Sequence, residues 1–238
     1  MTPLPGGASR RVPLPFPQAV LFDLDGTLAD TAPDLANAVN KLRTARGLDP
    51  LPYQPLRQLA SAGARGLIGA AFGIGPDDAR YPALRDEFLH NYQTDIAAGT
   101  RLFDGVAELL AFLQQNGIVW GIVTNKIARL TARLLPQIGL DGAACAISGD
   151  TTPFSKPHPA PLAAACAHIG IAAAHCWYVG DDLRDIQAGH AAGMKTVAAA
   201  WGYCGDTPAT TWRADAVVAS PLAMRRLIED AAKEIDRS

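Results

Sequence analysis

The amino-acid sequence predicts an α/β protein with a doubly wound, Rossmann-like parallel sheet and a small all-helical cap domain inserted after the first strand. Two observations predict this fold. From about residue 101 onwards, short apolar runs alternate with helix-length amphipathic segments, as in parallel βαβ units. Between residues 30 and 100, no segment indicates a strand, and this block is too long for a simple crossover. We therefore expect a core domain of residues 18–29 and 101–238 and a cap of residues 30–100, hinged near 28–30 and 97–103.

The first strand is predicted at residues 19–22, an apolar run with the length of a buried parallel strand. A helix should begin at Thr31, because a capping residue, a proline and an acid follow in order there, and it should end before Gly47. Within the cap, residues 64–72 predict a short helix between two glycines. A longer helix carries an apolar stripe at i, i+4 spacing. The stripe consists of Leu84, Phe88, Tyr92 and Ile96.

After the cap, helices and strands are expected to alternate along the chain. Helices are predicted at 104–116, 127–136, 159–169 and 184–192 and at the C-terminus. Strands are predicted at 118–123, 145–148, 177–179, 196–199 and 216–218. Because the carboxyl ends of parallel strands meet at one edge of the sheet, polar residues that follow these strands should gather there.

Composition narrows the class of partner. The chain of 238 residues is 49% hydrophobic with a formal charge of −2 and supports neither nucleic acid nor an anionic membrane as main partner. The four cysteines show no C-x-x-C spacing, which favours reduced thiols in a cytoplasmic protein. Residues 1–17 are rich in proline and indicate a flexible tail, and no apolar run is long enough to span a membrane. A small-molecule partner fits best, and the sequence leaves the oligomeric state open.

Two carboxylates, Asp23 and Asp25, stand one residue apart at the end of the first predicted strand, and Gly26 follows them. Residues i and i+2 of an extended chain point to the same side, so the two acids should lie close together. Such a pair is costly unless a cation neutralises it or one acid holds a proton. The pair therefore indicates a metal site, a catalytic pair, or both.

Further polar groups follow later strands: Thr124 and Asn125 after one strand, Lys156 in a loop, and an acidic turn at 180–185. Each has a structural explanation when taken alone. Thr124 is a plausible helix N-cap, Lys156 a surface lysine, and the acids of the turn a favourable helix start. Their common placement at strand ends, in this order, points to a functional site instead.

These residues resemble the four motifs of the haloacid dehalogenase superfamily of phosphatases. D-L-D-G-T-L at 23–28 resembles the first motif, Thr124 the second, Lys156 in S-K-P the third, and G-D-D-L-R-D at 180–185 the fourth. More narrowly, the chain resembles the phosphoglycolate phosphatase branch. Within that branch, residues 102–110, 120–126 and 179–186 are similar to N-acetylmuramic acid 6-phosphate phosphatases of bacterial cell-wall recycling.

The resemblance implies a role for each motif residue. Asp23 would attack phosphorus and form an aspartyl-phosphate, while Asp25 would serve as general acid and then general base. Thr124 and Lys156 would bind the transferring phosphoryl group. Mg²⁺ would be bound by the Asp23 carboxylate, the Asp25 backbone carbonyl and Asp181.

Other residues are expected to support this site. Gly26 would let the chain turn with its N–H groups facing phosphate, and Asn125 and Asp185 would support their neighbours. Asp182 stands where the family often has serine, so no role follows for it. The motif residues recognise only phosphate and metal, which places specificity in the cap. We nominate Gly63 and Arg65 there, with solvent exposure of Arg65 as the alternative.

The expected activity is hydrolysis of a small acidic phosphate ester, either N-acetylmuramic acid 6-phosphate or 2-phosphoglycolate. Arg65 does not separate the two, because both carry a carboxylate. A phosphomutase would also use both aspartates, and a non-catalytic regulator that has kept the fold is the alternative outside enzymology. Dehalogenation is disfavoured, because it would give Asp25 and the acidic turn no purpose.

Overall fold

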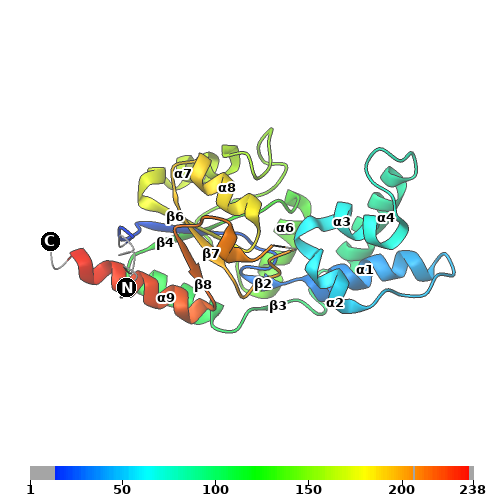
Figure 1. Ribbon diagram of the computed structural model, residues 1–238, viewed down its shortest axis with the longest axis horizontal. Helices are drawn as coiled ribbons and strands as arrows, with labels where there is room; N and C mark the ends of the chain where they lie inside the picture. Colours follow the sequence, from blue (N-terminus) through cyan, green and yellow to red (C-terminus); the bar gives the residue numbers. More distant parts are fainter. Residues whose placement is uncertain (1–13, 206, 236–238) are drawn as a thin grey trace, which may run out of the picture.

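A six-stranded parallel sheet forms the core of the protein in the computed structural model, which describes residues 14–205 and 207–235 (Figure 1). The strand order is β5-β4-β1-β6-β7-β8, with β1 in the interior of the sheet. This arrangement confirms the predicted doubly wound sheet. The strands are β1 (Ala19–Phe22), β4 (Val119–Val123), β5 (Ala146–Ile147), β6 (Cys176–Gly180), β7 (Lys195–Ala199) and β8 (Ala216–Val218).

Helices cover both faces of the sheet. In Figure 1, α7 and α8 lie on one side of it and α9 on the other. Helix α7 packs on β4 and β5, and α8 packs on β6 and β7, whereas α5 packs on β4 and against α9. These helices are α5 (Val106–Gln115), α6 (Ala128–Leu134), α7 (Ala160–Ile169), α8 (Leu183–Ala191) and α9 (Pro221–Ile235). None of the helices in the described ranges is both long and apolar enough to cross a membrane.

Four helices, which we call the cap, are inserted between β1 and the rest of the sheet and lie together beyond one end of it (Figure 1). They are α1 (Ala32–Thr44), α2 (Tyr53–Gln58), α3 (Gly63–Phe72) and α4 (Tyr81–Thr94). Both connections to the core run through a short antiparallel pair, β2 (Ala29–Asp30) with β3 (Arg101–Leu102). This pair was not predicted, because two residues are too few to show a strand pattern.

The predicted and observed elements differ mainly at their ends. Every core strand and helix predicted is present, and where bounds were predicted they differ by at most two residues. In the cap, α2 and the 3-10 turn at Ala60–Ala62 were not predicted, since α2 is short and holds a proline. The predicted stripe of α4 also runs too far: the helix ends at Thr94, and Ile96 is buried in the segment that follows.

The predicted tail divides into two parts. Residues 1–13 lie outside the described residues. Residues 14–17 contact the core: the Trp177 indole donates to the Pro15 carbonyl at 3.0 Å, and Phe16 packs against the main hydrophobic cluster. The backbone N–H of Gln18 then donates to the carbonyl of His175 at 2.9 Å, so the chain enters the sheet beside β6.

The interior position of β1 places the first acid. All four residues of the strand are fully buried, and Phe22 lies in register with Ile122 of β4 and Val179 of β6. The backbone N–H of Asp23 continues this ladder by donating to the Val179 carbonyl at 2.9 Å. Asp23 is therefore held at the carboxyl edge of the sheet, between the ends of two neighbouring strands.

Candidate active site

Asp23 presents one free carboxylate oxygen at this edge. Its Oδ1 accepts the backbone N–H of Leu24 at 2.8 Å and lies 2.9 Å from the ammonium of Lys156. Within residues 14–205 and 207–235, Oδ2 has no hydrogen-bond donor. The carboxylate is thus fixed through Oδ1, and Asp23 lines the adjoining pocket.

The turn after β1 requires glycine. Gly26 has a φ of +86°, in the left-handed region, and a Cβ there would lie 2.2 Å from Oδ2 of Asp181. Gly202 approaches Asp181 from another side, where a Cβ would lie 2.3 Å from the Asp181 Cβ. Two glycines therefore let the backbone close around the Asp181 carboxylate.

Lys156 is buried between two acids. Its ammonium lies 2.9 Å from Oδ1 of Asp23 and 2.7 Å from Oδ1 of Asp185, and it donates to the Tyr178 hydroxyl at 2.7 Å. Burial lowers the pKa of this lysine, but attraction to Asp185 and Asp23 outweighs burial and raises the pKa above its usual value. Lys156 is therefore a fixed positive charge beside Asp23.

Thr124 and Asn125 follow β4 directly. The Thr124 N–H donates to Ile147 at 2.9 Å, and its hydroxyl accepts the N–H of Lys126 at 3.2 Å. Thr124 does not cap α6, whose N-cap is Ile127. The Asn125 side chain donates to the Lys156 carbonyl at 3.0 Å and accepts the Lys156 N–H at 2.9 Å. Asn125 thus fixes the backbone that carries the site lysine.

Three buried acids, Asp23, Asp181 and Asp185, form a compact cluster whose carboxylate oxygens lie within 4.8 Å of one another. Burial, followed by repulsion from Asp23 and Asp185, raises the pKa of Asp181 well above its usual range. Burial also raises the pKa of Asp185 to about 7, although Lys156 opposes this shift. Ionising all three acids together is therefore unfavourable, and a bound cation would relieve their mutual repulsion.

This donor set fits a hard divalent cation such as Mg²⁺, which prefers carboxylate oxygens. Asp185 is the least available of the three acids. Its Oδ1 contacts Lys156, and its Oδ2 accepts the N–H of Asp182 at 3.0 Å. Asp181 accepts the Thr27 hydroxyl at 2.8 Å and the Tyr203 N–H at 3.0 Å, which orient its carboxylate.

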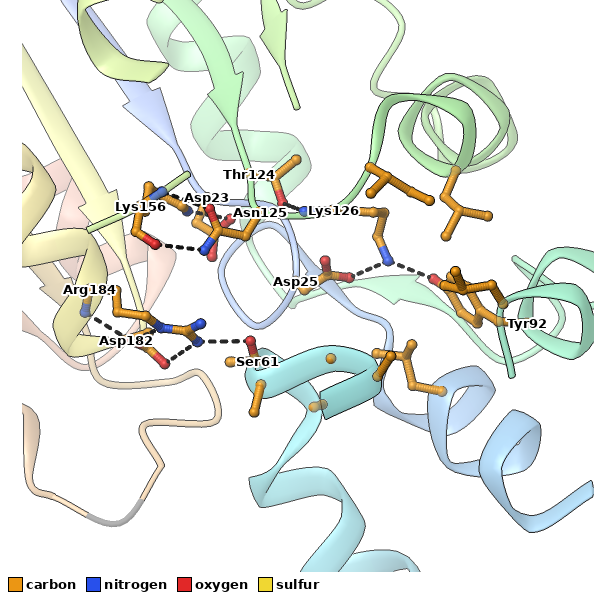
Figure 2. Close-up of a pocket in the computed structure, with 18 of the residues that line it drawn as sticks. Asp23, Asp25, Ser61, Tyr92, Thr124, Asn125, Lys126, Lys156, Asp182 and Arg184 are labelled. Atoms are coloured by element: carbon orange, nitrogen blue, oxygen red, sulfur yellow. Dashed lines mark hydrogen bonds and ion pairs between the residues drawn. The ribbon is translucent and has the colours of Figure 1, made fainter. Parts of the chain in front are cut away.

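Asp25 is held by groups that the sequence reasoning did not assign. The Thr31 hydroxyl donates to its Oδ1 at 2.5 Å, and the Lys126 ammonium lies 3.1 Å from the same atom. Thr31 stands at the N-cap position of α1 as predicted, but its side chain makes no capping bond. Lys126 also donates to the Tyr92 hydroxyl of α4 at 3.1 Å (Figure 2). The only sequence signal for Lys126 is its place two residues after Thr124.

Asp182, to which we assigned no role from its motif, caps α8. Its side chain accepts the backbone N–H of Arg184 at 2.9 Å, in a reciprocal capping box with Asp185. It also binds the Arg184 guanidinium, whose Nη2 donates to the Ser61 carbonyl of the cap at 2.8 Å (Figure 2). Ser61 in turn donates from its hydroxyl to Oδ2 of Asp181 at 3.3 Å. The acidic turn therefore contacts the cap directly.

A cavity of about 260 Å³ lies between this edge and the cap. Asp23, Asp25 and Lys156 line its floor. Apolar side chains of α1, α4 and the start of α6 also line it, namely Leu35, Phe88, Leu89, Ile127 and Leu130. Of the two predicted specificity residues, Gly63 lines the cavity and Arg65 does not. Arg65 is exposed, and the arginines that line the cavity are Arg85 and Arg184.

Comparison with known proteins identifies the family to which this chain belongs. The model of the haloacid dehalogenase-like hydrolases matches residues 20–199, more than half of the chain. The protein belongs to this family. This assignment confirms the resemblance carried by the four motifs, and the matched range includes Asp23, Thr124, Lys156 and Asp181.

Named relatives of this haloacid dehalogenase-like hydrolase are phosphatases. It is 49% identical over 208 residues to a phosphoglycolate phosphatase of Xanthomonas campestris pv. campestris, covering 87% of this chain and 94% of that protein. It is 42% identical over 215 residues to an N-acetylmuramic acid 6-phosphate phosphatase of Pseudomonas aeruginosa, covering 89% and 93%. The chain is accordingly an enzyme of the phosphatase type.

A solved structure shares its fold. The crystal structure of a predicted phosphoglycolate phosphatase from Haemophilus somnus superposes with a TM-score of 0.79 at 26% sequence identity. The match covers 88% of this chain and 97% of that one. It extends over both the sheet and the inserted cap, since those two parts make up nearly all described residues.

Proposed function

We propose that this protein is a Mg²⁺-dependent phosphomonoesterase that hydrolyses a small acidic phosphate ester through an aspartyl-phosphate. The free Oδ2 of Asp23 is the observation that carries the proposal. In the first step, this oxygen attacks phosphorus and forms the Asp23–phosphate bond, while the bond from phosphorus to the ester oxygen breaks. In the second step, water attacks the same phosphorus and releases inorganic phosphate, which restores the Asp23 carboxylate.

Asp25 is the proposed proton carrier. It gives a proton to the leaving ester oxygen in the first step and accepts one from the attacking water in the second, so the proton balance closes over one cycle. Its position two residues after Asp23, at the wall of the same cavity, suits both transfers.

Lys156 and Thr124 are the proposed phosphate ligands. Phosphoryl transfer spreads negative charge over the equatorial oxygens of phosphorus, and fixed donors that face this charge lower the barrier. Lys156 is a buried cation in contact with Asp23, and Asn125 orients its backbone. Thr124 lines the same cavity.

Asp23 and Asp181, together with the Asp25 backbone carbonyl, would hold Mg²⁺, with Asp185 in support. When bound, the ion would neutralise the acid cluster and polarise a phosphate oxygen. Without a cation, three buried carboxylates lie close together and repel one another, which the bound ion would relieve.

The substrate we favour is N-acetylmuramic acid 6-phosphate. The cap wall is mainly apolar, and Leu89 and Phe88 of the cap, with Leu130 of the core helix α6, offer contacts that the methyl groups of its lactyl and N-acetyl substituents can use. Such a wall gives little to 2-phosphoglycolate, whose non-phosphate part is a two-carbon acid. Phosphoglycolate is the second candidate, because the relative at 49% identity is named for it. The proposal includes a cytoplasmic location and a part in cell-wall recycling.

A comparison of kcat/KM for the two esters tests the choice. Phosphate release would be measured with Mg²⁺ for N-acetylmuramic acid 6-phosphate and for 2-phosphoglycolate in parallel. We expect a preference of at least about tenfold for the sugar ester, the scale on which apolar contacts discriminate. A preference for phosphoglycolate would reject the substrate and leave the phosphatase in place.

A further inference from the structure

Asp25 is fixed through only one of its two carboxylate oxygens. Oδ1 accepts the Thr31 hydroxyl and lies 3.1 Å from the Lys126 ammonium. Oδ2 has no donor in the part of the chain that the structure describes, and Asp25 lines the cavity. The side chain is therefore anchored through Oδ1 at the wall of the pocket.

Lys126 is one of the two anchors, and it is a buried cation. Its side chain is 6% exposed, and its ammonium lies 4.5 Å from the centre of the Tyr92 ring as well as 3.1 Å from the Tyr92 hydroxyl. Burial lowers the pKa of Lys126, but attraction to Asp25 and Tyr92 raises the pKa above the usual lysine value. The ammonium thus stays charged.

Tyr92 comes from the cap, whereas Asp25 and Lys126 come from the core. Its side chain is almost fully buried, and burial raises the pKa of its phenol to about 12, so the hydroxyl keeps its proton. Figure 2 shows Lys126 reaching between the two groups. A lysine side chain has several rotatable bonds, and the contacts with the phenol oxygen and the ring face restrict where its ammonium lies.

On the basis of the proposed function, we propose that Lys126 is a positioning residue for Asp25 and that Tyr92 places Lys126 only when the cap is docked on the core. The proton-carrying group is then complete only in the docked arrangement. Lys126 touches Asp25 rather than the reacting phosphorus, and its effect falls on the proton transfer to the ester oxygen.

Esters with different leaving groups isolate that transfer. The nitrophenolate of p-nitrophenyl phosphate leaves without a proton, whereas the sugar alkoxide of N-acetylglucosamine 6-phosphate needs one. The value of kcat/KM reports the steps up to formation of the aspartyl-phosphate, so it separates this proton transfer from the later attack of water. The variants are Lys126→Met and Tyr92→Phe, which keeps the ring face and removes the hydroxyl.

For Lys126→Met we expect kcat/KM to fall about 10²-fold on the sugar ester, the lower end of what a positioned acid contributes, and less than about threefold on the aryl ester. Tyr92→Phe should follow the same pattern with a loss of about threefold to tenfold on the sugar ester. A burst of nitrophenol should also appear in Lys126→Met, because the water step needs Asp25 as well.

Arg129→Met is the matched control. Arg129 also reaches from α6 to α4, where its guanidinium donates to Gln93 at 2.9 Å, one residue after Tyr92. The substitution Arg129→Met removes a cation from the same junction of α6 and α4, and Arg129 does not contact Asp25. In this variant, the ratio of kcat/KM on the sugar ester to kcat/KM on the aryl ester should stay at the wild-type value.

Two outcomes would overturn the inference. Equal losses of kcat/KM on the aryl and sugar esters would mean that Lys126 stabilises the fold or binds the phosphate group. A loss confined to KM for N-acetylmuramic acid 6-phosphate, absent for N-acetylglucosamine 6-phosphate, would make Lys126 a ligand of the lactyl carboxylate. If Lys126→Met fails to fold, Tyr92→Phe decides by the same ratio. A wild-type protein inactive on all three esters would reject the proposed function itself, a different result from either.

Discussion

The two walls of the cavity are built from different kinds of residue. The sheet edge consists of charged side chains that short turns and backbone hydrogen bonds hold in place, such as Asp23 on the end of β1 and Lys156 against Asn125. The cap wall consists mainly of apolar side chains on three helices, joined to the edge through Ser61 and Tyr92. The edge fits a cation and a phosphate group, and every phosphate ester carries that phosphate group. The cap wall faces the part of the ester that differs from one substrate to another.

The strongest test of the edge is the loss of the proposed nucleophile. Asp23→Asn should lower kcat on either candidate ester by about 10⁴-fold or more, because an amide oxygen cannot form the aspartyl-phosphate. Phosphate release and trapping of labelled phosphoenzyme would measure this. Asp49→Asn, a change at an exposed acid outside the cavity, serves as the control. Retention of a tenth of the activity in Asp23→Asn would rule out the proposed chemistry.

Lys156→Met should cost less, on the order of 10²-fold in kcat, by analogy with the loss of an oxyanion donor. The loss should be the same factor on both candidate esters, since Lys156 contacts the edge only. Lys195→Met is a matched change: Lys195 pairs with Asp215 at 2.8 Å on the surface, outside the cavity, and its loss should leave kcat unaltered. A loss that differs tenfold between the esters would contradict the division between edge and cap.

The sequence predicted the edge well for a physical reason. A strand, a glycine turn and the polar residues after it are local in the chain, so their spacing determines which groups reach the sheet edge. Gly26 is an example, since its positive φ belongs to the tight turn that directly follows β1. The order of apolar runs likewise fixed the parallel sheet.

The cap wall was less accessible to sequence reasoning. Arg65 was nominated from local sequence alone, but its direction depends on how α3 packs, and it points away from the cavity lining. Lys126 and Tyr92 are 34 residues apart, and no local spacing connects them. Arg184 was visible in the fourth motif, yet its contact with Ser61 spans 123 residues. Contacts of this kind follow from tertiary packing.

Metal binding should change how the stability of the sheet edge depends on pH. Asp185 has a pKa of about 7 in the folded protein against an ordinary value of 3.8, and the pKa of Asp181 is raised in the same direction. When folding raises the pKa of an acid, the acid's contribution to stability is fully present below its pKa in the unfolded chain. This contribution is lost as the pH rises through its pKa in the folded protein. The metal-free protein should therefore lose stability as the pH rises from about 4 towards 8.

Mg²⁺ should restore that stability where the acids are ionised. We expect saturating Mg²⁺ to raise the Tm by roughly 5–10 °C at pH 8, from about 2–3 kcal/mol of binding, and by less than half as much at pH 5.5. Thermal unfolding with Mg²⁺ and with EDTA at both pH values measures this. Asp181→Asn should abolish the difference. An equal rise in Tm at both pH values would contradict the assignment of the acid cluster as the metal site.

A change in the cap wall should alter preference more than turnover. Leu89→Asn puts a polar side chain on the apolar wall and should lower kcat/KM for N-acetylmuramic acid 6-phosphate by about tenfold, with little effect on 2-phosphoglycolate. Leu48→Asn, at a leucine that is 43% exposed and outside the cavity, is the control for a Leu-to-Asn change in the cap. Equal losses of kcat/KM on both esters for Leu89→Asn would mean that the cap wall does not determine substrate preference.

The smallest effect is expected where the two walls meet. Arg184 binds Asp182 through two donors and the Ser61 carbonyl through Nη2, so it holds a cap loop against the acidic turn. Arg184→Gln should lower kcat/KM about threefold, because it removes a partly exposed ion pair and one hydrogen bond. Phosphate release would be measured on N-acetylmuramic acid 6-phosphate and N-acetylglucosamine 6-phosphate.

These two esters differ by the lactyl ether group, which carries the carboxylate, and they separate the two roles open to an arginine that lines the cavity. If Arg184 holds the loop, both esters lose the same factor, and Asp182→Asn reproduces the loss because the guanidinium is then unanchored. If Arg184 binds the carboxylate of the substrate, only the acidic ester is affected. The second pattern would place a specificity residue on the edge, and the division of labour between the walls would then fail at this point.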